Sequence, residues 1–145
     1  MLSLALFSCG GNEPATNAPE AEVKSMIEEY DPTRGEGKFD ETNVTLGAID
    51  EEMAAKGEVI AQSKCFACHK ITDEKLVGPG WKGVTSRYTP HWIMNFILNP
   101  DPMLDKDPVL KKKVELYKTR MTNQNLTEDE ARQVLEFLRK NDGVK

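Results

Sequence analysis

The feature that most constrains this chain is the heptapeptide KCFACHK at residues 64–70, which places Cys65, Cys68 and His69 within one short turn. Two thiols and an imidazole at this spacing are rarely needed for core packing alone, so the chain is expected to fold around a group that they bind. Three chemistries use cysteines two residues apart: a zinc site, a thiol–disulfide enzyme and covalent haem attachment.

The first two chemistries lack partners in this sequence. A structural zinc site needs four ligands, and His91, the other of two histidines, is the only further imidazole. Adjacent Cys68 and His69 would also point in different directions on a helix. A thiol–disulfide enzyme places the motif between a strand and a helix, and no strand pattern precedes Cys65.

Haem attachment uses all three side chains. The thiols of Cys65 and Cys68 can each bond one vinyl group of the porphyrin, and His69 can then ligate the iron. A methionine opposite a histidine is a frequent second axial ligand. Met121, in the polar segment RMTNQNLT, is the predicted one, with Met103 in the Pro-rich segment NPDPMLDKDP and Met94 in a helical stripe as alternatives.

Helix signals recur along the chain without a competing strand pattern, so the predicted fold class is all-α. Thr89, Asp107 and Thr127 are each placed to cap a helix, and Thr127-x-x-Glu130 is a capping box. Gly57, inside the first helix of the main domain, indicates a close approach by another backbone. The predicted helices run from residue 48 into the motif and over 89–100, 107–118 and 127–141; residues 31–43 and the Pro-rich segment are predicted loops.

Composition narrows the function further. The chain has 145 residues, of which 39% are hydrophobic and 30% charged, and a net charge of −5. A cofactor that contributes apolar surface of its own suits such a chain. The negative net charge and the lack of a long basic stripe argue against nucleic-acid binding. No apolar stretch approaches the length of a membrane span.

The N-terminus suggests a membrane anchor. Leu6-Phe7-Ser8-Cys9-Gly10 after a short apolar run looks like a bacterial lipobox, in which Cys9 would be lipidated, although no basic segment precedes it. The predicted organisation is a signal at 1–9, a flexible linker rich in Gly, Pro and Ala at 10–21, an extension at 22–47 that begins with a helical stripe over 23–30, and the main domain at 48–145.

Taken in order, these features resemble a class I cytochrome c over roughly residues 48–143. Gly57 precedes CFACH, VGPGWKGV follows it, and a Trp-bearing helix, a late methionine and a capped C-terminal helix come next. The resemblance implies that Cys65 and Cys68 bond one haem c, that His69 and Met121 ligate its iron, and that the carbonyl of Pro79 orients His69. It also implies that Arg87 and Trp92 are donors to the haem propionates.

The function implied is one-electron transfer rather than enzymatic catalysis. We expect a periplasmic, lipid-tethered carrier that takes electrons from a quinol-oxidising complex and passes them to a terminal reductase or oxidase. The segments IEEYDPTRGEGKF and KITDEKLVGPGWKGVT are similar to cytochromes associated with nitrous oxide reductase in Bacteroidetes-like bacteria, which suggests that reductase as a partner. The alternative is a haem-based sensor or haem enzyme in which Met121 is displaced. The lysines between 106 and 118 are a candidate docking patch.

Overall fold

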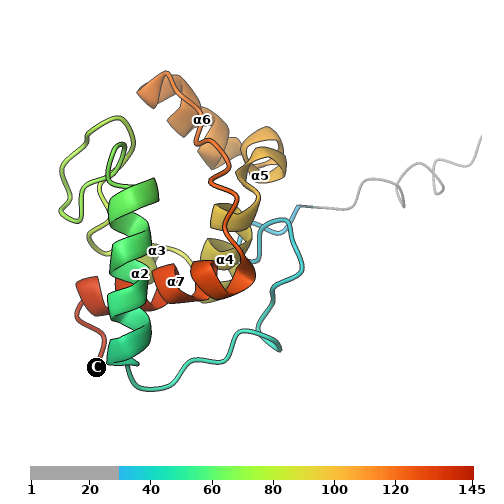
Figure 1. Ribbon diagram of the computed structural model, residues 1–145. Helices are drawn as coiled ribbons and strands as arrows, with labels where there is room; N and C mark the ends of the chain where they lie inside the picture. Colours follow the sequence, from blue (N-terminus) through green and yellow to red (C-terminus); the bar gives the residue numbers. More distant parts are fainter. Residues whose placement is uncertain (1–29) are drawn as a thin grey trace, which may run out of the picture.

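The structure, a computed structural model, describes residues 30–145, and all the regular secondary structure in this range is helical (Figure 1). The predicted lipobox with Cys9, the linker at 10–21 and all of the helical stripe before Tyr30 lie outside the described residues. The helices are α2 (Glu51–Lys64), α3 (Val84–Arg87), α4 (Pro90–Leu98), α5 (Pro100–Lys106), α6 (Pro108–Tyr117) and α7 (Glu128–Asn141).

Three of the four predicted helix starts are confirmed, whereas the helix predicted from residue 48 begins at Glu51, after its N-cap Asp50. The side chains of Thr89 and Asp107 accept hydrogen bonds from the first backbone N–H groups of α4 and α6, and a proline follows each of them. Thr127 and Glu130 form both halves of the capping box at α7. Because each cap satisfies N–H groups that the helix itself leaves without acceptors, these residues set where the helices begin.

The Pro-rich segment is the main difference from the predicted elements. It was expected to be a loop, but Pro100–Lys106 forms α5. Pro100 ends α4 and also occupies the first turn of α5, where its missing N–H costs nothing. Met103 and Leu104 of α5 are buried in the core, so tertiary burial compensates for the poor helix propensity of the prolines.

Helix α2 crosses α7, and this is the most extensive helix–helix contact (Figure 1). A Cβ built on Gly57 would lie 2.0 Å from the backbone oxygen of Gln133 in α7, which confirms the predicted close approach. The buried side of α2 consists of Ala54, Gly57 and Ala61. The larger residues of α2 are half-buried, such as Met53 and Ile60, or exposed, because a crossing this close leaves room for small side chains alone.

The remaining core lies between α4, α5, α6 and α7. Its largest fully buried side chains include Met94, Met103 and Leu135. Met94, predicted to be a core residue, is buried there. Buried charge occurs where Glu136 of α7 accepts hydrogen bonds from Arg132, Arg139 and the backbone N–H of Asp50. This network ties the start of α2 to the middle of α7.

Residues 30–47 run along the outside of the helices to the start of α2 (Figure 1). They contain turns and no helix, as predicted for 31–43. The buried side chain of Asn95 in α4 accepts a hydrogen bond from the backbone N–H of Phe39 and donates to the carbonyls of Arg34 and Phe39. Tyr30 donates a 2.7 Å hydrogen bond to Asp107. This part of the extension is therefore packed on the main domain.

None of the helices between residues 30 and 145 is both long enough and apolar enough to cross a bilayer.

Candidate haem site

The cysteine motif forms a tight turn at the end of α2. The N–H of Cys65 closes the last turn of the helix onto the carbonyl of Ala61, and the N–H groups of Cys68 and His69 both donate to the carbonyl of Cys65. Both cysteines are free thiols. Cys65 is buried and Cys68 is exposed, and burial raises the pKa of the Cys65 thiol from 9.0 to about 11.

The imidazole of His69 is held from three sides. Its Nδ1 donates a 2.8 Å hydrogen bond to the carbonyl of Pro79, the contact expected from the cytochrome c resemblance. The ring stacks on Trp81 at 5.2 Å, and a Cβ on Gly78 would lie only 2.6 Å from Cε1. Burial lowers the pKa of His69, although the hydrogen bond to Pro79 acts in the opposite direction. The neutral ring with its proton on Nδ1 leaves the lone pair of Nε2 for a metal.

Met121 lies in the irregular segment between α6 and α7 and lines the same cavity as Cys65, Cys68 and His69. Neither Met103 nor Met94 lines this cavity. Met103 packs instead against the extension, because a Cβ on Gly35 would lie 2.3 Å from its terminal methyl group. Of the three candidates, only Met121 is therefore brought together with the motif, and its ligation of iron stays a prediction.

The cavity has a volume of about 260 Å³ and a largely apolar lining. The walls come from the loop after the motif, from α3 to α6, from the segment between α6 and α7, and from one side of α7. The apolar residues that line it are Val77, Trp81, Val84, Trp92, Ile93, Phe96, Ile97, Leu104, Leu110, Val114, Leu126, Val134 and Leu138. Such a cavity suits a flat apolar ligand with a few fixed polar contacts.

The residues present fit a covalently attached haem. Two reduced thiols, one neutral imidazole with a free Nε2 and one thioether sulfur all border a single apolar cavity. This is the donor set of a His/Met haem with two thioether links. The zinc alternative gains no support, because His, Cys, Asp and Glu form no cluster of metal-binding type among residues 30–145.

Arg87 and Trp92, the two predicted propionate donors, both line the cavity. Arg87 is exposed and donates a 2.7 Å hydrogen bond to the carbonyl of Lys82. The buried indole nitrogen of Trp92 has no hydrogen-bond partner within the described part of the chain. Its ring neighbour Cδ1 faces Gly35 of the extension. Trp92 thus forms part of the wall, and its role as a donor stays a prediction.

Sequence reasoning missed several residues of this site. Gly78 and Trp81, which hold His69, lie in the VGPGW segment next to Pro79, so proximity to that proline was an available signal. Tyr88 and Lys113 also line the cavity and touch each other. Lys113 is one of three consecutive lysines, and nothing in the sequence separates it from its neighbours. His91, at the start of α4, is half-buried and does not line the cavity.

Comparison with known proteins agrees with this geometry. The family model described as cytochrome c matches residues 54–142. The chain is similar to the solved structure of cytochrome c from Rhodothermus marinus, with 41% identity, a TM-score of 0.67, and 72% of this chain and 90% of that chain covered. An engineered form of that protein, Rma TDE, is 40% identical over the same shares of both chains, with a TM-score of 0.66. No curated protein matches the sequence significantly.

The family match spans more than half of the chain, and the solved relative is similar in both sequence and fold. The cysteine motif, the fixed histidine and the apolar cavity agree with that similarity, and together they indicate a site for one covalently attached haem c. The chain therefore belongs to the cytochrome c family and is a haem-based electron carrier.

Proposed function

We propose that this protein is a periplasmic carrier, held to a membrane by a lipid on Cys9, that moves single electrons between a respiratory donor and a terminal reductase or oxidase. A quinol-oxidising complex is the proposed donor, and nitrous oxide reductase is the first acceptor to test. The observation that carries the electron-transfer part is the meeting of His69 and Met121 at one cavity whose other walls are apolar.

When bound by His69 and Met121, a haem would supply a one-electron Fe(III)/Fe(II) couple. The chain's own residues keep that site fixed. Pro79 and Trp81 hold the imidazole of His69 in one orientation, so little has to move when the charge changes. The aliphatic and aromatic walls offer water few hydrogen-bond partners, and a site with little water weakens the stabilisation of the more highly charged oxidised state.

The anchor is supported by sequence alone. Cys9 follows a short apolar run, and the segment after it is rich in Gly, Pro, Ala and Asn, a composition typical of a flexible tether. A Cys9→Ser variant of the full chain, expressed with its own N-terminus, should move from the membrane fraction to the soluble periplasmic fraction. Equal membrane retention of both forms would contradict the tether while leaving the haem site unaffected.

Docking is proposed to involve α6. Of the lysines from 106 to 118, Lys106 pairs with Glu36 and Lys113 is turned to Tyr88. Lys111 and Lys112 of α6 and Lys118 just after it remain exposed, and they can steer an acidic partner. Electron transfer to the reductase should then slow as salt rises, because the screening length falls to about 3 Å at 1 M. A rate that does not depend on salt would contradict this patch.

The ligand assignment has a direct test. Met121→Ala should abolish the weak near-infrared absorption that methionine–iron ligation gives in the oxidised protein and should lower the reduction potential, because the soft thioether favours ferrous iron. Met103→Ala is the matched control and should keep that absorption, since Met103 lies against Gly35. If the control loses the absorption and Met121→Ala keeps it, the assignment is wrong.

The same samples test the alternative function. A sensor or haem enzyme with a displaceable Met121 would bind carbon monoxide tightly in the reduced wild-type protein. A carrier should bind it appreciably only as the Met121→Ala variant.

A further inference from the structure

We propose that Tyr88 and Lys113 form the polar anchor for the carboxylate edge of the bound haem. The proposal deepens the haem-binding role of this cavity and does not depend on the respiratory partners. It starts from the charges of the lining. Four cationic side chains border the cavity and no aspartate or glutamate does: the cations are Lys64, Arg87, Lys113 and Arg120. Such a cavity is electrostatically suited to an anionic ligand, and haem carries two propionate carboxylates.

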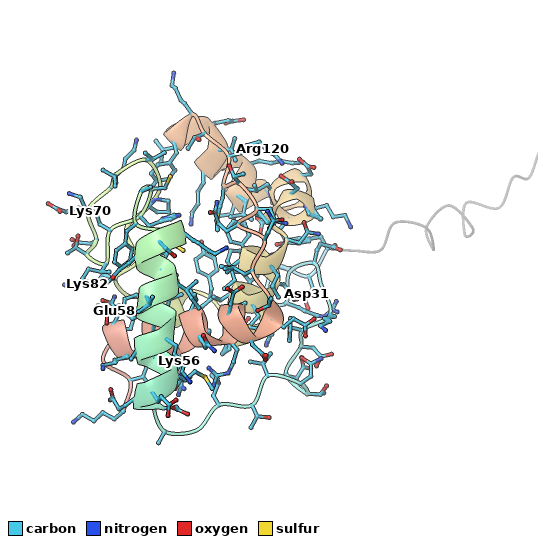
Figure 2. All side chains as sticks on the ribbon, in the orientation of Figure 1. Asp31, Lys56, Glu58, Lys70, Lys82 and Arg120 are labelled. Atoms are coloured by element: carbon cyan, nitrogen blue, oxygen red, sulfur yellow. The ribbon has the colours of Figure 1, made fainter. Side chains whose placement is uncertain are left out.

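Three of the four cations contact backbone carbonyls or carboxylates. Lys64 donates a 3.2 Å hydrogen bond to the carbonyl of Gln124. Arg87 donates to the carbonyl of Lys82, and Arg120 forms ion pairs with Asp101 and Asp105. Figure 2 shows Arg120 on the outside of the molecule, above α5. The charge of Arg120 is thus already balanced by carboxylates.

Lys113 differs from these three in its contact, which is the hydroxyl of another residue of the lining. Its ammonium donates to the hydroxyl of Tyr88 and lies 5.0 Å from the centre of the same ring. Like Lys64 and Arg87, and unlike Arg120, it forms no ion pair with a carboxylate within residues 30–145. A half-buried ammonium whose contact is a neutral hydroxyl has two further N–H groups to donate. Because the hydroxyl beside it can also donate, Lys113 is the cation of the lining that can bind a carboxylate together with a second donor.

The ring of Tyr88 is also held in a fixed position. Its ring stacks on Trp92 at 4.0 Å with an interplanar angle of 16°, and Trp92 stacks in turn on Phe96. Its backbone N–H closes the turn onto the carbonyl of Val84. Because the Tyr88 oxygen accepts from Lys113, its own proton points elsewhere and can be donated. The pair therefore offers O–H and N–H donors together, as a carboxylate requires.

The contrast with Trp92 supports this assignment. The Trp92 indole is sandwiched between the two rings, and its Cδ1, the ring atom next to the N–H, faces Gly35 of the extension. Both residues line the cavity, but only the Tyr88 hydroxyl contacts a cation of the lining, Lys113. The anchor thus consists of Lys113 from α6 and Tyr88 from the end of α3, which contact each other.

The test uses haem-loaded full chain and compares Lys113→Gln with Lys112→Gln, which removes the same charge from an exposed neighbour in α6. A unit charge at roughly 10 Å, at an effective dielectric constant between about 20 and 80, changes an ionisation or redox equilibrium roughly 2- to 15-fold. We expect Lys113→Gln to shift the ratio of reduced to oxidised protein, at fixed applied potential, toward the oxidised form by this factor. The shift should persist at 1 M salt, whereas the Lys112→Gln shift should be small and screened.

Two further measurements exclude a merely structural effect. Redox-difference infrared spectra should show altered haem carboxylate bands in Lys113→Gln and in Tyr88→Phe, and unchanged bands in Lys112→Gln. Lys113→Arg, which keeps the charge, should restore most of the wild-type redox ratio. The proposal is overturned if Lys113→Gln and Lys112→Gln behave alike at high salt, or if Tyr88→Phe leaves the carboxylate bands unchanged. Should Lys113→Gln fail to mature, the Tyr88→Phe spectra decide.

Discussion

Gly57→Ala tests the helix crossing on which the fold depends. Two effects oppose each other. In a helix interior, alanine is more favourable than glycine by about 1 kcal/mol. Against this, the new Cβ would lie 2.0 Å from the backbone oxygen of Gln133 and 3.0 Å from Cβ of Phe137. The first of these atoms belongs to the backbone of α7 and cannot rotate away, so the two helices have to move apart.

The size of the effect follows from that displacement. Contacts of a real Cβ below 3.0 Å are essentially never seen, so the crossing has to open by about 1 Å. A gap of that size forfeits a quarter to a half of each contact of 0.1–0.2 kcal/mol, or about 3 kcal/mol over roughly 60 atom pairs. Subtracting the gain in helix propensity leaves a net loss of about 2 kcal/mol.

The assay is urea unfolding of the haem-loaded protein followed by far-ultraviolet circular dichroism. Gly47→Ala is the control, because no atom lies within 4 Å of its Cβ position and it is exposed; it should change stability by less than about 0.5 kcal/mol. If Gly57→Ala were as stable as the wild type or more stable, propensity would outweigh packing, and the close approach of α2 and α7 would be refuted.

Two other perturbations probe the buried polar contacts. Glu136→Gln should cost roughly 3 kcal/mol in urea unfolding, because it leaves the buried guanidinium of Arg139 without a counter-charge. Burial opposes ionisation of Glu136, but hydrogen bonds from Arg132, Asp50 and Arg139 outweigh it and lower its pKa below 4.5. The stability that the ionised carboxylate contributes is therefore present above that pH and lost below it. The wild type should lose more stability than the variant on acidification, and equal losses would contradict this reasoning. Asn95→Leu should make the extension more sensitive to trypsin at Arg34 and Lys38, because three hydrogen bonds from the Asn95 side chain to the backbone of Arg34 and Phe39 are lost. The control is Asn99→Leu, at an exposed position just beyond the same helix. Equal cleavage of both variants would contradict the packing of the extension.

Local signals were sufficient for the helix starts and for part of the haem site. Thr89, Asp107 and Thr127 cap helices with hydrogen bonds that span only two or three residues, so the sequence around them contains the whole interaction. Much the same holds for Cys65, Cys68 and His69, whose spacing fits three chemistries, of which the sequence supplies partners for haem attachment. The close approach of another backbone at Gly57 was also predictable, because a glycine within a helix is seldom needed except for close packing.

Interactions between distant segments decided the rest. Met103 and Met121 are equivalent as ligands by chemistry, and only the folded chain places one against Gly35 and the other at the cavity with His69. Helix α5 forms in a Pro-rich segment because burial of Met103 offsets its weak local propensity. Lys113 differs from Lys112 only through Tyr88, 25 residues away. Local hydrogen bonds and the spacing of residues in a motif are determined by neighbouring residues, whereas burial and charge pairing depend on which segments the fold brings together.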